Sequence, residues 1–167
     1  MRLFTIGYEG AEIADFLATL VGHGISQVID VRDIPISRKR GFSKNRLREA
    51  LAEHGIEYLH LKGLGDPKAG REAARAGKFA AFRAIYGKHL QTPVAQAAME
   101  EARGTAASRV SCLLCFERSN ENCHRSIVAD RLARHNKFNV QHIAVQAPTR
   151  GRRKAMHDRP THDFAFG

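Results

Sequence analysis

The stretch RVSCLLCF, residues 109–116, decides the fold of this chain. Apart from Arg109 and Ser111 it is apolar, and it has neither glycine nor proline, which is typical of a strand buried on both faces. Because successive side chains of a strand point to opposite faces, Cys112 and Cys115 are expected to face opposite sides of the sheet. Glu117 comes just after the run and falls on the same face as Cys115. The stretch therefore predicts a buried central strand that ends at a charged group.

Four further apolar runs predict the remaining strands: RLFTIG (2–7), QVIDVR (27–32), IEYLHL (56–61) and NVQHIAV (139–145). Helical patterns separate the strands and cover residues 13–21, 43–55, 71–90, 92–103 and 123–135. Ser43 is expected to cap the second helix, and Thr92-Pro93 to start the fourth. Strands that alternate with helices predict an α/β fold. We expect a single domain with a mainly parallel sheet of about five strands and helices on both faces, a Rossmann-like three-layer arrangement.

The α/β domain is expected to span residues 1–145. Residues 146–167 have little periodicity, and five Arg or Lys residues outnumber two Asp residues there. This composition predicts a basic, flexible C-terminal tail.

Composition and charge narrow the class of protein. The chain has 167 residues, of which 43% are hydrophobic and 26% charged, and no apolar run approaches the roughly 20 residues of a membrane helix. Three cysteines are too few for a disulfide scaffold, so we expect reduced thiols, a cytoplasmic location and no membrane partner. The net charge of +10 favours an anionic partner, such as a nucleotide or nucleic acid.

Polar side chains gather where the predicted parallel strands end, which is where open α/β sheets bind ligands. Arg32 and Arg38 follow the second strand and could clamp a phosphate, although ion pairs with Asp30 or Asp33 would also explain them. Tyr8 and His60 are equally compatible with packing and with ligand contact. The expected ligand-binding residues are Tyr8, Arg32, Ser37, Arg38, His60 and Arg125.

All three cysteines lie in CLLCFERSNENCHRS, residues 112–126. A structural zinc bound by Cys112, Cys115, Cys123 and His124 has the right number of ligands. The strand parity argues against it, because Cys112 would face away from the others. A cysteine-phosphatase loop from Cys112 to Arg118 is also disfavoured, because the intervening residues are apolar and contain no glycine. We therefore expect no metal, and no particular cofactor is indicated.

The preferred interpretation keeps residues 109–116 as a strand and places Cys123 at the start of the next helix. There the helix dipole and neighbouring cations would lower the pKa of its thiol. Glu117, Cys123, His124 and Arg125 could then form one polar cluster, with Glu117, Cys123 and His124 as the catalytic residues. In the alternative, Cys123 is a capping thiol bonded to Glu117, and His124 and Arg125 are surface groups.

Several motifs in one order resemble the bacterial and archaeal domain of unknown function 488 family: TIGY, IDVRDIPISR, GIEYLHLKGLG, LLCFE, CHR and VQHI. The resemblance covers residues 3–143 and implies a single α/β domain with a mainly parallel sheet. The positions that match the family's motifs are Gly7, Tyr8, Asp30, Arg32, Pro35, Ser37, Arg38, Tyr58, Leu64, Gly65, Cys115, Glu117, Cys123, His124 and Arg125. Many members resemble LGG at the third turn, whereas this chain has Asp66 after Leu64-Gly65.

Two functional hypotheses follow from these residues. In the first, the chain is an enzyme that acts on a phosphate-bearing substrate, a nucleotide or nucleic acid, with Glu117 or His124 as general acid or base and Cys123 as nucleophile or structural latch. In the second, the same arginines make a non-catalytic module that binds nucleic acid or another anion. A structural zinc protein is the further alternative.

Overall fold

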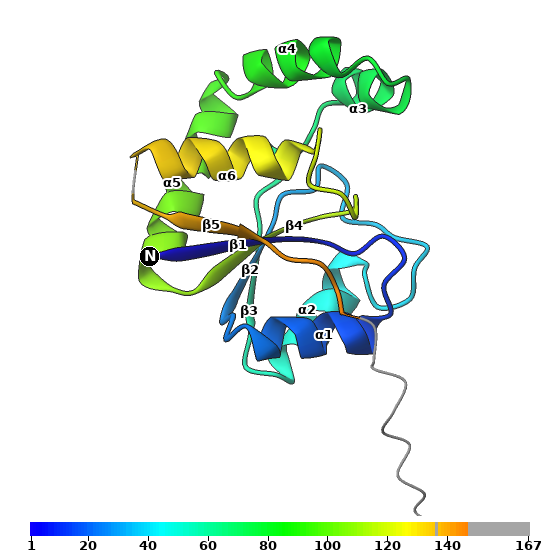
Figure 1. The fold of residues 1–167 in the computed structure, drawn as a ribbon, viewed down its shortest axis with the longest axis vertical. Coiled ribbons are helices and arrows are strands. Elements are labelled where there is room, and N and C mark those ends of the chain that lie inside the picture. Colours follow the sequence, from blue (N-terminus) through cyan, green and yellow to red (C-terminus); the bar gives the residue numbers. More distant parts are fainter. Residues whose placement is uncertain (136, 147–167) are drawn as a thin grey trace, which may run out of the picture.

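The computed structural model describes residues 1–135 and 137–146, and within them the strands form one parallel sheet. The strand order is β3-β2-β4-β1-β5, and each neighbouring pair is parallel. The strands are β1 (Arg2–Gly7), β2 (Gln27–Asp30), β3 (Glu57–His60), β4 (Ser111–Cys115) and β5 (Asn139–His142). The predicted parallel α/β sheet is therefore confirmed, with β4 at its centre (Figure 1).

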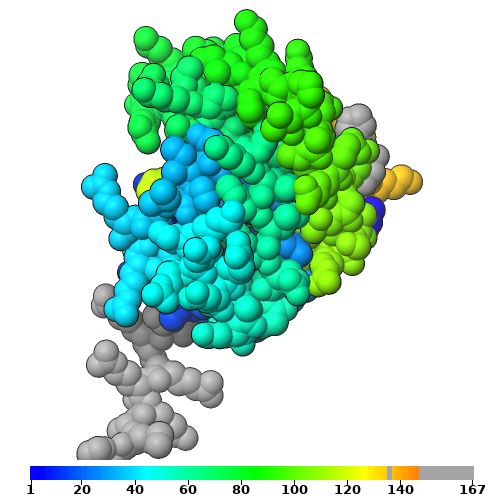
Figure 2. Space-filling model, turned by 180° about the vertical axis from the view of Figure 1, so that it is seen from behind, coloured from blue at the N-terminus to red at the C-terminus, as the bar shows by residue number. Residues whose placement is uncertain are grey.

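Helices cover both faces of the sheet, so the three-layer arrangement is also confirmed (Figure 1). The helices are α1 (Ile13–Gly22), α2 (Lys44–Ala52), α3 (Lys68–Arg75), α4 (Phe79–His89), α5 (Pro93–Ser108) and α6 (His124–His135), with a short 3-10 turn η1 (Lys62–Leu64). Helices α1 and α2 pack on one face, and α4, α5 and α6 on the other. Seen from behind, the segment from α2 to α5 forms most of the visible surface (Figure 2).

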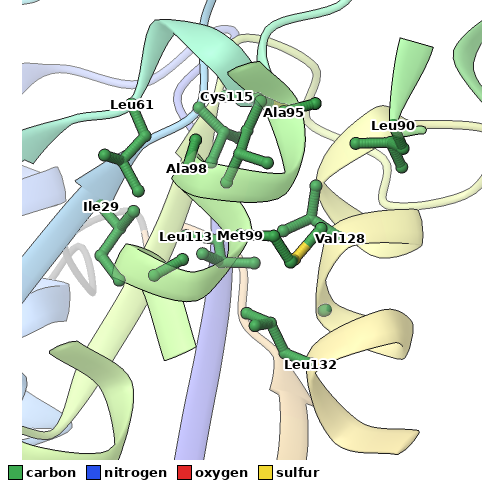
Figure 3. Packing of buried hydrophobic residues seen from close by; sticks show 14 of the residues in the cluster. Ile29, Leu61, Leu90, Ala95, Ala98, Met99, Leu113, Cys115, Val128 and Leu132 are labelled. Carbon is green, nitrogen blue, oxygen red and sulfur yellow. The ribbon is translucent and has the colours of Figure 1, made fainter. Parts of the chain in front are cut away.

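The two faces of β4 belong to two separate cores. Cys112 and Leu114 pack with α1 and α2, whereas Leu113 and Cys115 pack with α5 and α6. Figure 3 shows Leu113 and Cys115 among residues of these two helices, including Met99 and Val128. Cys112 and Cys115 thus face opposite sides of the sheet, as the parity of the strand RVSCLLCF predicts.

The second strand is shorter than its apolar run because the side chain of Asp30 takes a backbone N–H that would otherwise continue the strand pairing. Residues 27–32 were expected in the strand, but β2 ends at Asp30. The backbone N–H of Arg32 donates to Asp30 Oδ1 at 3.1 Å instead of to a neighbouring strand.

The long helical region of residues 71–90 is two helices, α3 and α4. Gly77 lies between them with φ of 69°, a left-handed conformation that suits glycine and turns the chain. The cap of α2 also differs from expectation. Ser43 occupies the N-cap position, but its hydroxyl makes no cap bond and instead donates to Ser37 O at 3.1 Å. Thr92, by contrast, caps α5 as predicted, accepting from the N–H of Ala95.

The basic tail lies almost wholly outside the described residues. Of residues 146–167, only Gln146 is described, and its N–H donates to Thr19 Oγ1 at 3.1 Å. Within the described part of the chain, none of the helices combines the length and the apolar character that crossing a membrane requires.

Gly7, the last residue of β1, is required by a close approach of two chain segments. A Cβ at this position would lie 1.7 Å from the carbonyl oxygen of Glu117. The N–H of Glu9 donates to Phe116 O at 2.8 Å, and the N–H of Arg118 donates to Glu9 Oε2 at 3.0 Å. The end of β1 therefore holds the segment that follows β4.

Replacing Gly7 by alanine should destabilise the protein, because neither backbone can move without breaking these bonds. We expect Gly7→Ala to lower the free energy of unfolding by at least about 1–3 kcal/mol in chemical denaturation. Gly104→Ala is the matched control: this site is in α5 with open space around it, so the substitution should stabilise by about 0.5–1 kcal/mol. Equal effects of the two substitutions would contradict the contact.

Candidate active site

A cavity of about 530 Å³ opens at the carboxyl ends of the strands. Its walls come from the segments after β1 and β2, from α3 and the residues just before it, and from the segment between β4 and the start of α6. The lining residues are Tyr8, Arg32, Asp33, Ile34, Ile36, Ser37, Arg38, Lys39, Asp66, Arg71, Arg75, Phe116, Glu117 and His124. Six of the nine sequence-predicted site residues thus lie in its wall, and Cys123, Arg125 and His60 lie outside it.

Arg32 is held by a buried ion pair rather than left free for a ligand. Its Nη2 is 2.6 Å from Asp30 Oδ2, and its Nη1 donates to Tyr8 Oη and to Phe42 O, both at 2.9 Å. The hydroxyl of Tyr58 donates to the same carboxylate oxygen at 2.6 Å. Burial and this neighbouring carboxylate raise the pKa of Tyr58. The ion-pair explanation weighed for Arg32 is therefore the one the structure supports.

Tyr8 and His60 pack beside this ion pair. The ring of Tyr8 stacks on Phe42 with centroids 4.4 Å apart. His60 Nε2 lies 2.8 Å from Arg32 O, so its ring fixes the backbone of the cavity wall from outside. Arg38 and Lys39 are placed differently, because both line the cavity and neither guanidinium nor ammonium is buried in the core.

The second group of polar side chains, here called the thiol cluster, consists of Cys115, Glu117, Cys123, His124 and Arg125. The two sulfurs are 3.0 Å apart, and Glu117 Oε2 accepts from Cys115 at 3.0 Å and lies 3.4 Å from the sulfur of Cys123. Arg125 Nη1 lies 2.8 Å from the first sulfur and 3.3 Å from the second. The cluster expected from the sequence is therefore formed, with Cys115 as an additional member.

Local chain geometry explains why these residues meet. Cys115, the last residue of β4, and Glu117, which follows the strand, lie on the same face. The chain then turns through Asn122, whose φ of 54° is left-handed. The turn places Cys123 immediately before α6. Arg125 stabilises this loop by donating to Glu117 O at 2.6 Å and to Arg118 O at 3.2 Å.

The pKa values of Cys115 and Cys123 are shifted in opposite directions by burial and neighbouring charges. Burial raises the pKa of Cys115 well above its ordinary value, and its hydrogen bond to Cys123 adds to the rise. Burial also opposes ionisation of Cys123, but hydrogen bonds from Cys115 and His124 and the charge of His124 outweigh it and lower the pKa to about 5.

His124 balances that thiolate. Although burial favours the neutral imidazole, the hydrogen bond and negative charge of Cys123 raise the pKa of His124 to about 9. Its Nε2 lies 2.9 Å from Val31 O and its Nδ1 3.9 Å from the Cys123 sulfur. The pair is thus arranged as a thiolate beside an imidazolium, a combination suited to nucleophilic and acid–base chemistry.

The same atoms are the candidates for holding a metal ion. One ligand atom from each of Cys115, Glu117, Cys123 and His124 lies within 4.8 Å of the others. This set differs from the zinc set considered from the sequence, because Cys112 faces the opposite core and Glu117 takes its place.

Sequence reasoning missed Asp66, a carboxylate in the cavity wall. Its side chain is 6% exposed, and among the described residues Oδ1 has no hydrogen-bond partner. Burial raises its pKa to about 6, against the attraction of His124 and Arg71. The signal was present as the departure from the family's LGG pattern, where a residue with a carboxylate replaces a glycine.

Arg71 and Arg75 of α3 were missed as well, because nothing in a surface helix marks which of its cations faces a distant loop. Arg71 Nη1 is 2.8 Å from Asp33 Oδ2 and also donates to Asp66 O. These two arginines join Arg38 and Lys39 in the lining of the cavity.

The low pKa of Cys123 predicts a distinctive alkylation profile. Because the thiolate is the reactive form, its reaction with iodoacetamide should vary less than about threefold between about pH 6 and pH 8. A thiol with an ordinary pKa near 8.5 would vary roughly 70-fold over that range. Peptide mass spectrometry of the native protein should find Cys123 modified first and Cys112 last. Equal labelling of all three cysteines would contradict the assignment.

Asp66 should make stability depend on pH. Its pKa in the folded protein, about 6, exceeds the ordinary 3.8, so the folded state binds the proton more tightly. That contribution to stability is fully present below about pH 4 and is lost as the pH rises through about 6. The unfolding free energy of Asp66→Asn relative to the natural protein should therefore increase between about pH 4 and pH 7. A difference that is constant with pH, measured by urea denaturation, would refute this.

Comparison with known proteins gives one match. The family model described as "Domain of unknown function DUF488" matches residues 12–132. Neither the curated proteins nor the solved structures contain a match to this chain. The matched region runs from α1 to α6 and includes the ion pair after β2, Asp66, Arg71 and the thiol cluster. Since the model covers well over half of the chain, the protein belongs to the DUF488 family.

Proposed function

We propose that the protein is an enzyme that acts on a phosphate-bearing substrate, a nucleotide or a nucleic acid, bound in the cavity at the carboxyl edge of the sheet. The observation that carries the proposal is that reactive and anion-binding groups share one cavity. Glu117 and His124 line the same cavity as Arg38, Lys39, Arg71 and Arg75.

The cations supply the binding part of the proposal. Arg38 and Lys39 approach from the segment after β2, and Arg71 and Arg75 from α3. Guanidinium groups match phosphate oxygens in a bidentate way. Arg71 and Lys39 are already paired with Asp33 and Glu12, so a bound phosphate would share them with these carboxylates. The net charge of +10 would attract a polyanion to this site.

The thiol cluster supplies the chemical part. In this proposal Cys123 is the nucleophile, His124 donates a proton to the leaving group, and Glu117 orients both thiols through one carboxylate oxygen. Arg125 touches both sulfurs and two backbone carbonyls, so it acts as a positioning residue rather than a ligand. Its side chain is 1% exposed, which keeps it away from the cavity.

The alternative, an anion-binding module without turnover, uses the cations alone. It leaves the thiolate–imidazolium pair and the carboxylate beside the cavity without a role. Both hypotheses predict binding, and only the enzyme hypothesis predicts that the thiol cluster is needed for product formation.

Binding is tested by calorimetry with inorganic phosphate, nucleoside mono-, di- and triphosphates and short oligonucleotides. We expect Arg38→Ala to weaken binding of the best ligand at least about tenfold, because a charged hydrogen bond contributes about 1.5–3 kcal/mol. Arg40→Ala is the matched control, since Arg40 is a cation of the same segment that does not line the cavity. Equal losses in the two variants would indicate nonspecific attraction only.

Turnover is tested by chromatographic analysis of the bound ligands after incubation. Glu117→Gln keeps the shape of the side chain and should leave binding within about threefold while lowering the rate by about 100-fold or more. If the natural protein binds a ligand and converts none of them, the binding module is the correct function.

A further inference from the structure

The two thiols of the cluster are close enough for a reaction with each other. The sulfurs of Cys115 and Cys123 are 3.0 Å apart, and both side chains are buried. Cys112, the third cysteine, is on the other face of β4 and packs with α1 and α2. The chain therefore contains one dithiol and one isolated thiol.

The surroundings of the dithiol favour a thiolate. The guanidinium of Arg125 lies within hydrogen-bond distance of both sulfurs, and the side chain of Arg125 is enclosed in the core. Glu117 Oε2 lies 3.0 Å and 3.4 Å from the two sulfurs, where it can take the proton of Cys115, but its charge opposes a thiolate at Cys123. A neighbouring cation makes a cysteine reactive, and the cations here are Arg125, beside both sulfurs, and His124, beside Cys123.

The spacing suits a disulfide better than a shared metal ion. Two thiolates on one tetrahedral zinc, each at about 2.3 Å from the ion, would be about 3.7 Å apart. The observed 3.0 Å is shorter than that and shorter than a van der Waals contact of two sulfurs. The fixed positive charge of Arg125 beside both sulfurs also opposes the entry of a second cation.

We propose that Cys115 and Cys123 form a peroxide-oxidised disulfide, with Cys123 as the attacking thiol and Cys115 as the resolving thiol. The Cys123 thiolate attacks one oxygen of hydrogen peroxide, the O–O bond breaks, and the leaving hydroxide takes a proton to become water. The Cys115 thiol then gives its proton to Glu117 while its sulfur attacks the sulfenic sulfur, the S–O bond breaks, and the leaving hydroxide takes up that proton to become a second water. In total, two thiols and one hydrogen peroxide give one disulfide and two waters.

The order of the two thiols follows from their positions. Cys123 precedes α6 and neighbours His124, which lines the cavity, and its side chain is 3% exposed. Cys115, at the end of β4, is fully buried. A small oxidant entering from the cavity therefore reaches Cys123 first, and Cys115 resolves from within the core. The sulfenic acid and the disulfide are the reversible steps of cysteine oxidation.

The disulfide would switch off the nucleophile of the proposed enzyme, but the reaction does not depend on that function. It requires only the two sulfurs, an oxidant and the intact fold. Phosphate binding by the Arg38 wall is measured separately, so either proposal can fail without the other.

The test uses the full chain, fully reduced, freed of reductant and treated with equimolar hydrogen peroxide. Free thiols are then alkylated under denaturing conditions and the protein is digested without reduction. Mass spectrometry should find a peptide pair linked through Cys115 and Cys123, lighter by two hydrogens than the reduced pair, with Cys112 alkylated. A reductant should reverse the change. Cys112→Ser, the matched control, should form the same disulfide to the same extent.

Cys115→Ser separates the two steps. Without the resolving thiol, Cys123 should stop at the sulfenic acid, which dimedone traps. A disulfide that includes Cys112, or oxidation that leaves both Cys115 and Cys123 alkylatable, would overturn the proposal. So would elemental analysis showing one tightly bound zinc per chain that protects the pair from peroxide. The experiment on the natural chain decides the matter even if a variant fails to fold.

Discussion

The burial of Arg125 is the constraint on which the rest of the site depends. A guanidinium in a protein core must have its donors satisfied, and this one is satisfied by elements far apart in the chain. It donates to two carbonyls of the loop after β4, touches both sulfurs, and reaches Thr5 of β1 from its Nε at 3.4 Å. Thr5 in turn contacts His142 of β5 at 2.8 Å. The loop, the dithiol and the start of α6 can be arranged in few other ways while this charge remains paired.

The Asp30–Arg32 ion pair and the carboxyl of Asp66 contribute differently to the cavity wall. The Asp30–Arg32 ion pair is fully internal and shapes the wall, so the cavity has few options to reorganise around a ligand. Asp66 Oδ1, by contrast, has no hydrogen-bond partner among the described residues, and its side chain belongs to the cavity wall. Burial raises the pKa of Asp66 to about 6, so this carboxyl changes its charge close to neutral pH. The position at which this chain departs from the LGG pattern therefore adds a titratable group to the cavity wall.

The fold could be predicted from the sequence because strand parity and helical spacing are local properties. The faces of Cys112 and Cys115, the cap at Thr92 and the gathering of polar groups at the strand ends all follow from residues close in the chain. Arg71 and Arg75 could not be predicted as cavity residues, because their placement depends on how α3 packs against the segment after β2, whereas Asp66 was marked by its departure from the LGG pattern. Arg125 was expected to contact a ligand. Its side chain turns inward and donates to Glu117 O and Arg118 O, and the positions of these loop carbonyls cannot be read from the sequence.

The strand order has a consequence for synthesis on the ribosome. β1 and β2 are not neighbours: the place between them belongs to β4, which begins at Ser111, whereas β1 ends at Gly7 and β2 at Asp30. When the first three strands have left the ribosome, two strand edges remain unpaired and wait for residues 111–115. Exposed edges of this kind are the sites at which nascent chains aggregate. β4, the strand that completes the sheet, also carries Cys115. Cys115 and Cys123 therefore come together only after β4 has joined the sheet and the helices can pack on both of its faces.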